Sequence, residues 1–336
     1  MNNFSHFEFE NFVRNDAVRF KEKQQIKKCS NLVSVAYIIL WLIPYLFSRV
    51  VSDMGKLFGI TEVIKNLYDD PAFIMLLQTL LSVVMFTLPF LIVPAGLGRK
   101  TKELISFGLP EKNLFLPLLL AGAGTSAFAN IATNIISGLF SSVGIEFLSP
   151  EIEYPRGIFG FLLSFTAIAI VPALVEEFAI RGIVMGSSKE FGEGFALAVS
   201  SVIFAMMHGN FVQIPFALIM GAVIGFAVIK TGSIWTGIAI HFVNNAVSVI
   251  MNYVTEDMES VVLQSVIMVI YYAVCTLCFF VGILLAHKSG CKVWTLEKSE
   301  SALSVGEKTK YFFLTPFMIV AIILTVISCL DYIYIV

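Results

Sequence analysis

The chain is dominated by apolar runs, each of which is long enough to cross a lipid bilayer. A transmembrane helix needs about 20 mostly apolar residues. Nine stretches have this character, at residues 31–51, 72–95, 114–140, 157–188, 192–208, 211–229, 233–253, 262–286 and 311–335. Inside a bilayer such stretches form helices, because a helix satisfies its own backbone hydrogen bonds. The sequence therefore predicts an all-α fold: a polytopic transmembrane helical bundle of about nine spans.

Composition excludes the other broad classes of protein. Of the 336 residues, 57% are hydrophobic and only 14% are charged, whereas a soluble domain carries about 25% charged residues. The 31 Phe residues also argue against a disordered chain. A net charge of -2 offers no basic surface for nucleic acid. The partner that composition implies is the lipid bilayer, and a nucleic-acid partner is excluded.

The basic residues are distributed unevenly between the apolar runs. If the N-terminus is cytoplasmic, eighteen of the 22 Lys and Arg residues lie on the cytoplasmic side. The other four are Arg49, Lys56, Lys65 and Arg156. Cytoplasmic segments of membrane proteins carry such an excess of positive charge. The asymmetry predicts a cytoplasmic N-terminus and an odd number of spans, because eight or ten spans would break the alternation.

Ionisable side chains inside membrane spans are costly, which makes them candidates for function. Here they are concentrated between residues 176 and 245. They are Glu176, Glu177 and Arg181 on the fourth run, His208 at the end of the fifth, and His241 with the amides Asn244 and Asn245 on the seventh. At about 1.5 Å of rise per residue, Glu176, His208 and His241 lie about 18, 24 and 12 Å from the cytoplasmic ends of their helices. Three helices thus bring polar groups to depths that all lie inside a hydrocarbon core about 30 Å thick.

Each of these residues also has a purely structural interpretation. Glu177 and Arg181 stand at i, i+4 and could form an ion pair at the end of the helix. His208 could cap a helix, and His241 could form an interhelical hydrogen bond. Their location inside the hydrocarbon core favours one common site. The chain has neither a GxSxG nor an HExxH motif, so hydrolysis at such a site would rely on water activated by a general base.

These groups resemble the three motifs of the CAAX-protease and bacteriocin-processing (CPBP, or Abi) family of intramembrane peptidases. The motifs are EExxxR, FxxxH and HxxxN on separate helices, and the matches are Glu176-Glu177…Arg181, Phe204…His208 and His241…Asn245. The resemblance covers about residues 155–250. It implies that residues 151–255 form a catalytic core.

The resemblance also implies a role for each residue. Glu176 would be the general base that activates water, and His208 would share that water. His241 and Asn245 would stabilise the oxyanion. Glu177 and Arg181 would shape and neutralise the wall behind Glu176, and Phe204 would lie one turn below His208.

The resemblance leaves open whether the site binds a metal ion. Members of the family are often described as metal-dependent, and Glu176, His208 and His241 could hold zinc with a water in the fourth position. Asn245 is a poor zinc ligand and a good hydrogen-bond donor. We therefore favour a glutamate peptidase without a cofactor, with zinc as the alternative.

The remainder of the chain has a simple expected organisation. Cys275 and Cys278 have CxxC spacing, but they lie inside the eighth run and are interpreted as packing residues. The expected parts are a cytoplasmic leader at 1–30, as an interfacial helix or a solvated tail, spans one to three at 31–150, and spans eight and nine at 256–336 with a cytoplasmic linker at 287–310.

Three functions fit these residues. The preferred one is an endopeptidase acting on a membrane-associated substrate such as a CAAX-type tail, a leader peptide or a bacteriocin-related peptide. The alternatives are a non-catalytic immunity or scaffold protein of the same family, and a proton-coupled transporter. The sequence shows no internal repeat, which weighs against a transporter. We expect a multi-pass protein in the plasma membrane of a bacterium.

Overall fold

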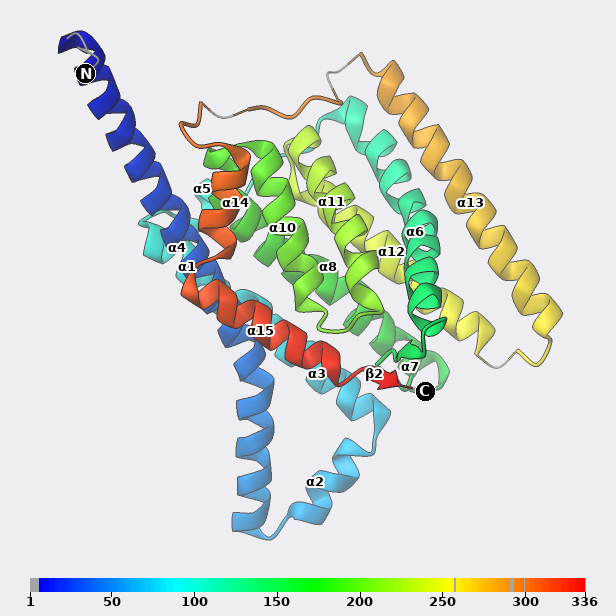
Figure 1. Ribbon diagram of the computed structural model, residues 1–336. Coiled ribbons are helices and arrows are strands. Elements are labelled where there is room, and N and C mark those ends of the chain that lie inside the picture. The colour runs from blue at the N-terminus through cyan, green and yellow to red at the C-terminus, as the bar shows by residue number, and fades with distance from the viewer. Residues whose placement is uncertain (1–5, 151, 257, 291–292, 299, 336) are drawn as a thin grey trace.

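The apolar runs fold mainly as helices, which assemble into a bundle (Figure 1). The computed structural model describes residues 6–150, 152–256, 258–290, 293–298 and 300–335, with side chains from residue 16 onward. Its two strands, β1 (Ile145–Phe147) and β2 (Ile333–Ile335), have three residues each. The predicted all-α fold class is confirmed.

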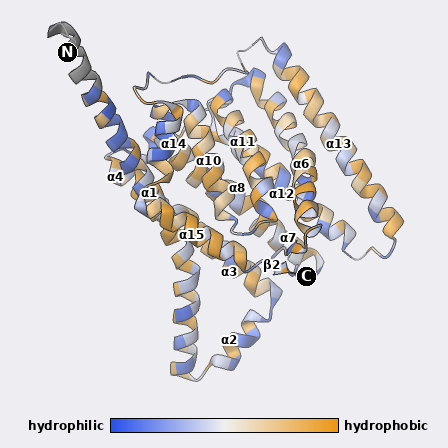
Figure 2. Ribbon diagram, viewed as in Figure 1, coloured by the Kyte–Doolittle hydropathy of each residue, from blue (hydrophilic) through white to orange (hydrophobic). Residues whose placement is uncertain are grey.

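The long helices lie side by side, and apolar residues line almost the whole of α13 and α15 (Figure 2). They are α1 (His6–Phe58), α3 (Pro71–Thr87), α6 (Lys112–Ser141), α10 (Glu193–Met207), α11 (Gln213–Thr231), α12 (Ile234–Thr255), α13 (Val261–Lys288) and α15 (Pro316–Leu330). Shorter ones are α2 (Thr61–Tyr68), η1 (Pro89–Leu91), α4 (Ile92–Leu97), α5 (Thr101–Leu104) and α14 (Val305–Phe313). The fourth run forms the consecutive helical segments α7 (Gly157–Ser164), η2 (Phe165–Ile170), α8 (Val171–Glu177), η3 (Phe178–Met185), α9 (Gly186–Ser188) and η4 (Lys189–Phe191).

The predicted spans differ in the length and continuity of the helices that form them. Within the described residues, seven helices are long and apolar enough to cross a membrane, or eight if the bent pair α14–α15 is one span. That pair is bent by 73°, because Pro316 begins α15 and disfavours helical geometry at Thr315. Helix α10 has only 15 residues, about 22 Å of rise. The nine predicted spans therefore correspond to seven long helices, one bent pair and one short apolar helix.

The sequence predicts that the leader, residues 1–30, is either an interfacial helix or a solvated tail. In the structure, its described part from residue 6 is the first half of α1 and continues into the first span without a break. Residues Ile26, Cys29 and Ser30 are fully buried. The Ser30 hydroxyl donates a 2.5 Å hydrogen bond to the Phe312 carbonyl of α14. Residues 6–30 thus belong to the same helix as the first span, and residues 1–5 lie outside the described part of the chain.

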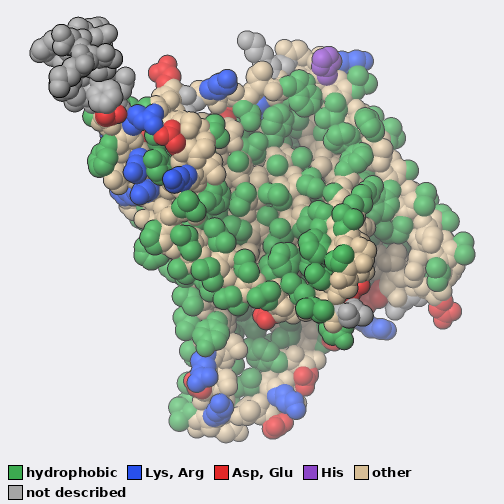
Figure 3. All heavy atoms as spheres, in the orientation of Figure 1, with side chains coloured by type: hydrophobic (Ala, Val, Ile, Leu, Met, Phe, Trp, Pro, Cys, Tyr) green, Lys and Arg blue, Asp and Glu red, His purple; other side chains and the backbone are tan. Residues whose placement is uncertain are grey.

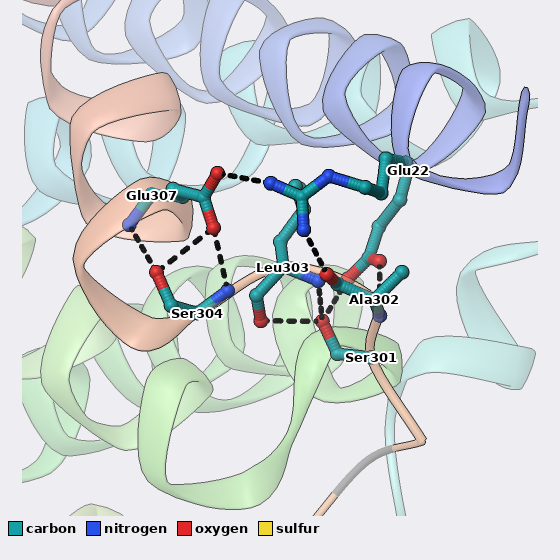
Figure 4. Close-up of polar contacts among 7 residues, drawn as sticks. Glu22, Ser301, Ala302, Leu303, Ser304 and Glu307 are labelled. Atoms are coloured by element: carbon teal, nitrogen blue, oxygen red, sulfur yellow. Dashed lines mark hydrogen bonds and ion pairs between the residues drawn. The ribbon is translucent and has the colours of Figure 1, made fainter. Parts of the chain in front are cut away.

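The connection between α13 and α14 is fastened to α1 (Figure 4). The Glu22 carboxylate accepts hydrogen bonds from the Ser301 hydroxyl and, at 3.0 Å, from the Ala302 amide. Arg19 donates to the Ala302 carbonyl at 2.8 Å. The expected linker at 287–310 is shorter, because α13 continues to Lys288 and α14 begins at Val305.

On the face shown in Figure 3, the charged side chains gather at the two ends of the bundle, and an apolar belt lies between them. At one end, the linker end, the start of α1 meets the α13–α14 connection. At the other, the β1 end, β1 pairs with β2 near the C-terminus (Figure 1). Helices α6 and α12 begin at the linker end and finish at the β1 end, whereas α11 and α13 run the opposite way (Figure 1).

Candidate active site

The two adjacent glutamates end α8, between two π-helical segments. Segment η2 precedes α8 and segment η3 follows it. A π-helix bonds each residue to the fifth one along the chain, so it is wider than an α-helix, and such segments often occur at functional sites. Both glutamates therefore lie at the C-terminal end of the seven-residue α-helix between the two π-helical segments.

Glu177 is the centre of a buried ion-pair network. Its Oε1 atom accepts hydrogen bonds from Arg181 Nη1 and from His241 Nδ1, each at 2.9 Å. The side chains of Glu177 and Arg181 are both 0% exposed. Arg181 Nη2 also donates to the Gly221 carbonyl of α11 at 3.0 Å. The ion pair between Glu177 and Arg181 that the i, i+4 spacing allows is therefore present. It lies in the protein interior, and its hydrogen bonds connect this helix to α11 and α12.

Glu176 has a different environment from its neighbour. Its side chain is 17% exposed, and its Oε2 atom lies 3.9 Å from His241 Nε2. Because Glu177 accepts at Nδ1 of His241, that nitrogen carries a proton. The other ring nitrogen, Nε2, is thus the one directed at Glu176.

His208 caps α10 and has a fixed tautomer when neutral. Its Nδ1 lies 3.0 Å from the Phe204 carbonyl oxygen, which can only accept, so Nδ1 carries the proton and Nε2 is left as an acceptor. The Phe204 ring lies edge-on to both imidazoles, with centroids 5.1 Å from His208 and 5.8 Å from His241. The Arg181 guanidinium stacks on the same ring at 4.4 Å. Phe204 thus fixes the spacing of these three groups.

Asn245 is held in one orientation by two neighbours. Its Nδ2 donates to the Ile168 carbonyl of η2 at 2.9 Å, and its Oδ1 accepts from Asn244 Nδ2 at 3.1 Å. An amide nitrogen has two hydrogens, so one donor of Asn245 remains available. Both amides line the same cavity as Glu176.

This cavity has a volume of about 710 Å³ and unites the predicted residues. That volume lies within the range of about 300–1,000 Å³ that is typical of ligand sites. Of the predicted residues, Glu176, Phe204, His208, His241 and Asn245 line it. Glu177 and Arg181 do not line it and lie behind His241 in the wall. The structure thus brings together all of the residues that the three motifs supplied.

The cavity also has polar residues that sequence reasoning missed. Asn130, Thr133 and Asn134 of α6 line it, and so do Gln213 of α11 and Tyr271 of α13. The Thr133 hydroxyl is buried and has no hydrogen-bond partner among the described residues. The sequence does contain a signal for these residues: Asn130 and Asn134 stand at i, i+4 in the third apolar run, so they share one face of its helix.

The described residues contain no preassembled group of metal-ligating side chains. No three His, Cys, Asp or Glu side chains within the described part of the chain come together as a group that could hold a metal ion. Each histidine has its Nδ1 engaged, by Glu177 in one case and by a backbone carbonyl in the other. Glu176, His208 and His241 thus share a cavity, and both rings keep a free Nε2, as metal-ligating histidines do, but among the described residues the three side chains are not gathered into one three-ligand group.

The comparison with known proteins gave one finding. Searches of curated proteins and of solved structures gave no significant match. A family model described as "Type II CAAX prenyl endopeptidase Rce1-like" matches residues 158–247. That segment contains the whole cluster from Glu176 to Asn245, so residues 158–247 are similar to an Rce1-like domain, in agreement with the resemblance to the CPBP family.

Proposed function

We propose that this protein is an intramembrane endopeptidase in which Glu176 activates water against a peptide bond of a membrane-associated substrate. The observation that carries the proposal is the convergence of Glu176, His208 and His241 on one cavity inside an apolar bundle. Each group comes from a different helix, and ionisable groups at such depth are costly unless they have a use.

The geometry supports a first step in which Glu176 and His208 together bind and activate the attacking water. A water in the cavity would donate one hydrogen to the Glu176 carboxylate and the other to the free Nε2 of His208. As the water oxygen bonds to the carbonyl carbon, Glu176 takes its proton and then delivers it to the leaving amine nitrogen when the C–N bond breaks. General-base and general-acid roles of this kind contribute about 10²–10⁴-fold each.

The oxyanion would be stabilised from α12. When the His241 ring carries both protons, its Nε2–H is a donor directed into the cavity, and the remaining Nδ2–H of Asn245 is a second. Donors that are already in place stabilise the transition state without reorganisation. Glu177 is a positioning residue: it holds His241 Nδ1 while its charge is matched by Arg181.

The finer parts of the proposal concern substrate, metal and location. We propose a CAAX-type tail, a leader peptide or a bacteriocin-related peptide as substrate, and a mechanism without metal, because Asn245 is a poor zinc ligand and a good hydrogen-bond donor. We also propose that the N-terminus faces the cytoplasm of a bacterium, on the basis of the positive charge at that end.

The test is peptidase activity of the purified full chain in lipid nanodiscs, with casein, an unstructured polypeptide, as the probe and mass spectrometry of the fragments. We expect Glu176→Gln to lower kcat by about 10²–10⁴-fold, because the general base is lost. His208→Ala should have a smaller effect in the same direction. Glu190→Gln is the matched control, since Glu190 pairs with Arg99 far from the cavity.

Two outcomes would contradict the proposal in different ways. Undiminished cleavage by both the Glu176 and the His208 variant would remove the assigned catalytic residues. Loss of activity on exhaustive chelation, restored by zinc alone, would replace the metal-free mechanism by a zinc mechanism.

A further inference from the structure

The active-site cavity extends towards the β1 end of the bundle. Ser149, which follows β1, lines it, and so do Gln213 at the first turn of α11 and Met251 near the last turn of α12. Its deepest lining residues along these helices are Ile224 and His241. No lining residue belongs to the described connections at the linker end. Because Ser149 is also exposed, the cavity reaches the surface near the β1 end.

A strand with one free edge leads to this opening. β1 pairs with β2 in antiparallel register, with Glu146 opposite Tyr334, and the Leu148 amide donates to the Tyr332 carbonyl at 2.9 Å. Hydrogen-bonding residues alternate along an antiparallel strand, so the backbone groups of Ile145 and Phe147 point away from β2. Among the described residues, these groups have no hydrogen-bond partner on that side.

The surroundings of β1 place this edge beside the cavity. The Phe147 ring stacks on Phe211, with centroids 5.2 Å apart, and the next residue, Val212, lines the cavity. The pairing with β2 shows that the main chain of β1 can bind an extended apolar segment by backbone hydrogen bonds. An exposed strand edge binds extended peptides by adding them to the sheet, and the main-chain hydrogen bonds tolerate many side chains.

We infer that the substrate is an extended peptide segment which reaches the cavity from the β1 end and pairs with the free edge of β1. This inference rests on the proposed peptidase function, and it names the form of the substrate and its route. With the N-terminus in the cytoplasm, the β1 end faces away from the cytoplasm, so the substrate segment would be one exposed on the outer side of the membrane. Of the proposed substrates, this route fits a leader peptide or a bacteriocin-related peptide and not a cytoplasmic CAAX-type tail.

The first experiment detects the peptide without requiring cleavage. The photo-crosslinker p-benzoylphenylalanine is placed at Ser149 in the full-length Glu176→Gln protein, in nanodiscs. The probe is a biotinylated ten-residue peptide in which apolar and charged residues alternate. Ile158, which is 76% exposed near the start of α7 and does not line the cavity, is the control position. We expect crosslinking at Ser149 to exceed that at Ile158 at least fivefold.

The second experiment tests strand pairing itself. Two versions of the probe carry N-methyl groups on the odd or on the even residues. The alternation of side chains keeps the peptide in one register, so only one version loses the amides that face β1. We expect one version to lose crosslinking at least fivefold and the other to keep it. Equal crosslinking by both versions, or equal loss in both, would overturn the pairing.

A third measurement separates this inference from the proposed function. In the active protein, Ser149→Trp should narrow the cavity mouth and lower kcat/KM for casein at least tenfold, whereas Ile158→Trp should change it less than twofold. Cleavage that Ser149→Trp leaves unchanged, with no crosslink at Ser149, would overturn the route and leave the peptidase assignment standing. Crosslinking at Ser149 in a protein that cleaves nothing would support the route and remove the peptidase assignment.

Discussion

At the scale of single residues, two adjacent glutamates have opposite environments. Glu177 is fully buried and bonded to Arg181 and His241, whereas Glu176 reaches the cavity. One step along a helix turns a side chain by about 100°, which is enough to separate a positioning residue from a group that meets water. The EE pair is thus a single sequence feature with two structural roles.

The buried network makes Glu177 important for stability. Glu177→Gln leaves the Arg181 charge without its partner, and breaking a buried ion pair in this way costs about 3–5 kcal/mol. We expect a clearly lower thermal unfolding temperature in detergent. Glu190→Gln, which breaks a half-exposed pair with Arg99, should cost at most about 1 kcal/mol. Equal unfolding temperatures for the two variants would show that the buried pair has no stabilising role.

Gly237 is required by the close approach of α12 to Glu177. A Cβ atom at this position would lie 2.9 Å from Glu177 Oε2 and 2.7 Å from Val228 Cγ2. We expect Gly237→Ala to displace the carboxylate from His241 and to lower kcat for casein at least tenfold. Gly138→Ala in α6, where a Cβ meets nothing within 4 Å, is the control. An unchanged kcat in Gly237→Ala would exclude a positioning role for Glu177.

The sequence supplied these residues but not their partners. The i, i+4 spacing predicted the contact between Glu177 and Arg181, because that contact depends only on local helix geometry. The bond from His241 joins residues 64 apart in the chain, and no local pattern determines it. Glu177 was therefore expected only to neutralise the wall, and its direct bond to His241 was not foreseen.

At the scale of elements, α13 packs on α6 through its backbone. Gly282 of α13 lies against Pro117 and Ala121, and Gly124 of α6 lies against Cys275 and Phe279. Small residues permit such close approach of helices in membranes. Most of α13 is otherwise exposed at the edge of the bundle (Figure 1).

Enlarging Gly282 should therefore separate α13 from the bundle. A Cβ there would lie 2.6 Å from the Pro117 carbonyl oxygen, and overpacking of this kind costs about 1–3 kcal/mol. We expect Gly282→Leu to lower the thermal unfolding temperature. Leu277→Ala, which alters an exposed face of the same helix, should leave it nearly unchanged. If the two variants unfold at the same temperature, the close α6–α13 contact is not required for stability.

Hydropathy predicted the helices and missed their interruptions. The bend before Pro316 had a sequence signal, but the last apolar run continues through it. The strands β1 and β2 have three residues each, too few for an alternating pattern to be recognised. The π-helical segments η2 and η3 depend on packing with their neighbours, so composition does not reveal them.

At the scale of the whole molecule, the start of α1 and strand β2 lie at opposite ends of the bundle (Figure 1). Together with the positive charge near the N-terminus, this predicts that the termini lie on opposite sides of the membrane. We expect green fluorescent protein to fluoresce when fused to the N-terminus in a bacterial host, and alkaline phosphatase to be active when fused to the C-terminus. Two cytoplasmic termini would show that the number of crossings is even and would contradict the nine spans.

The π-helical segments before and after Glu176 have a consequence for insertions and deletions. A π-turn holds one residue more than the α-turn that could replace it. Deleting one residue within Phe165–Ile170 could therefore restore regular helical bonding and preserve the span. Because the α-turn completes the same rotation with one residue fewer, Glu176 would keep its direction relative to α7. Related sequences could thus differ by one residue here, keep every helix and still direct their glutamate at the histidines, so a one-residue gap in this stretch is compatible with an intact site.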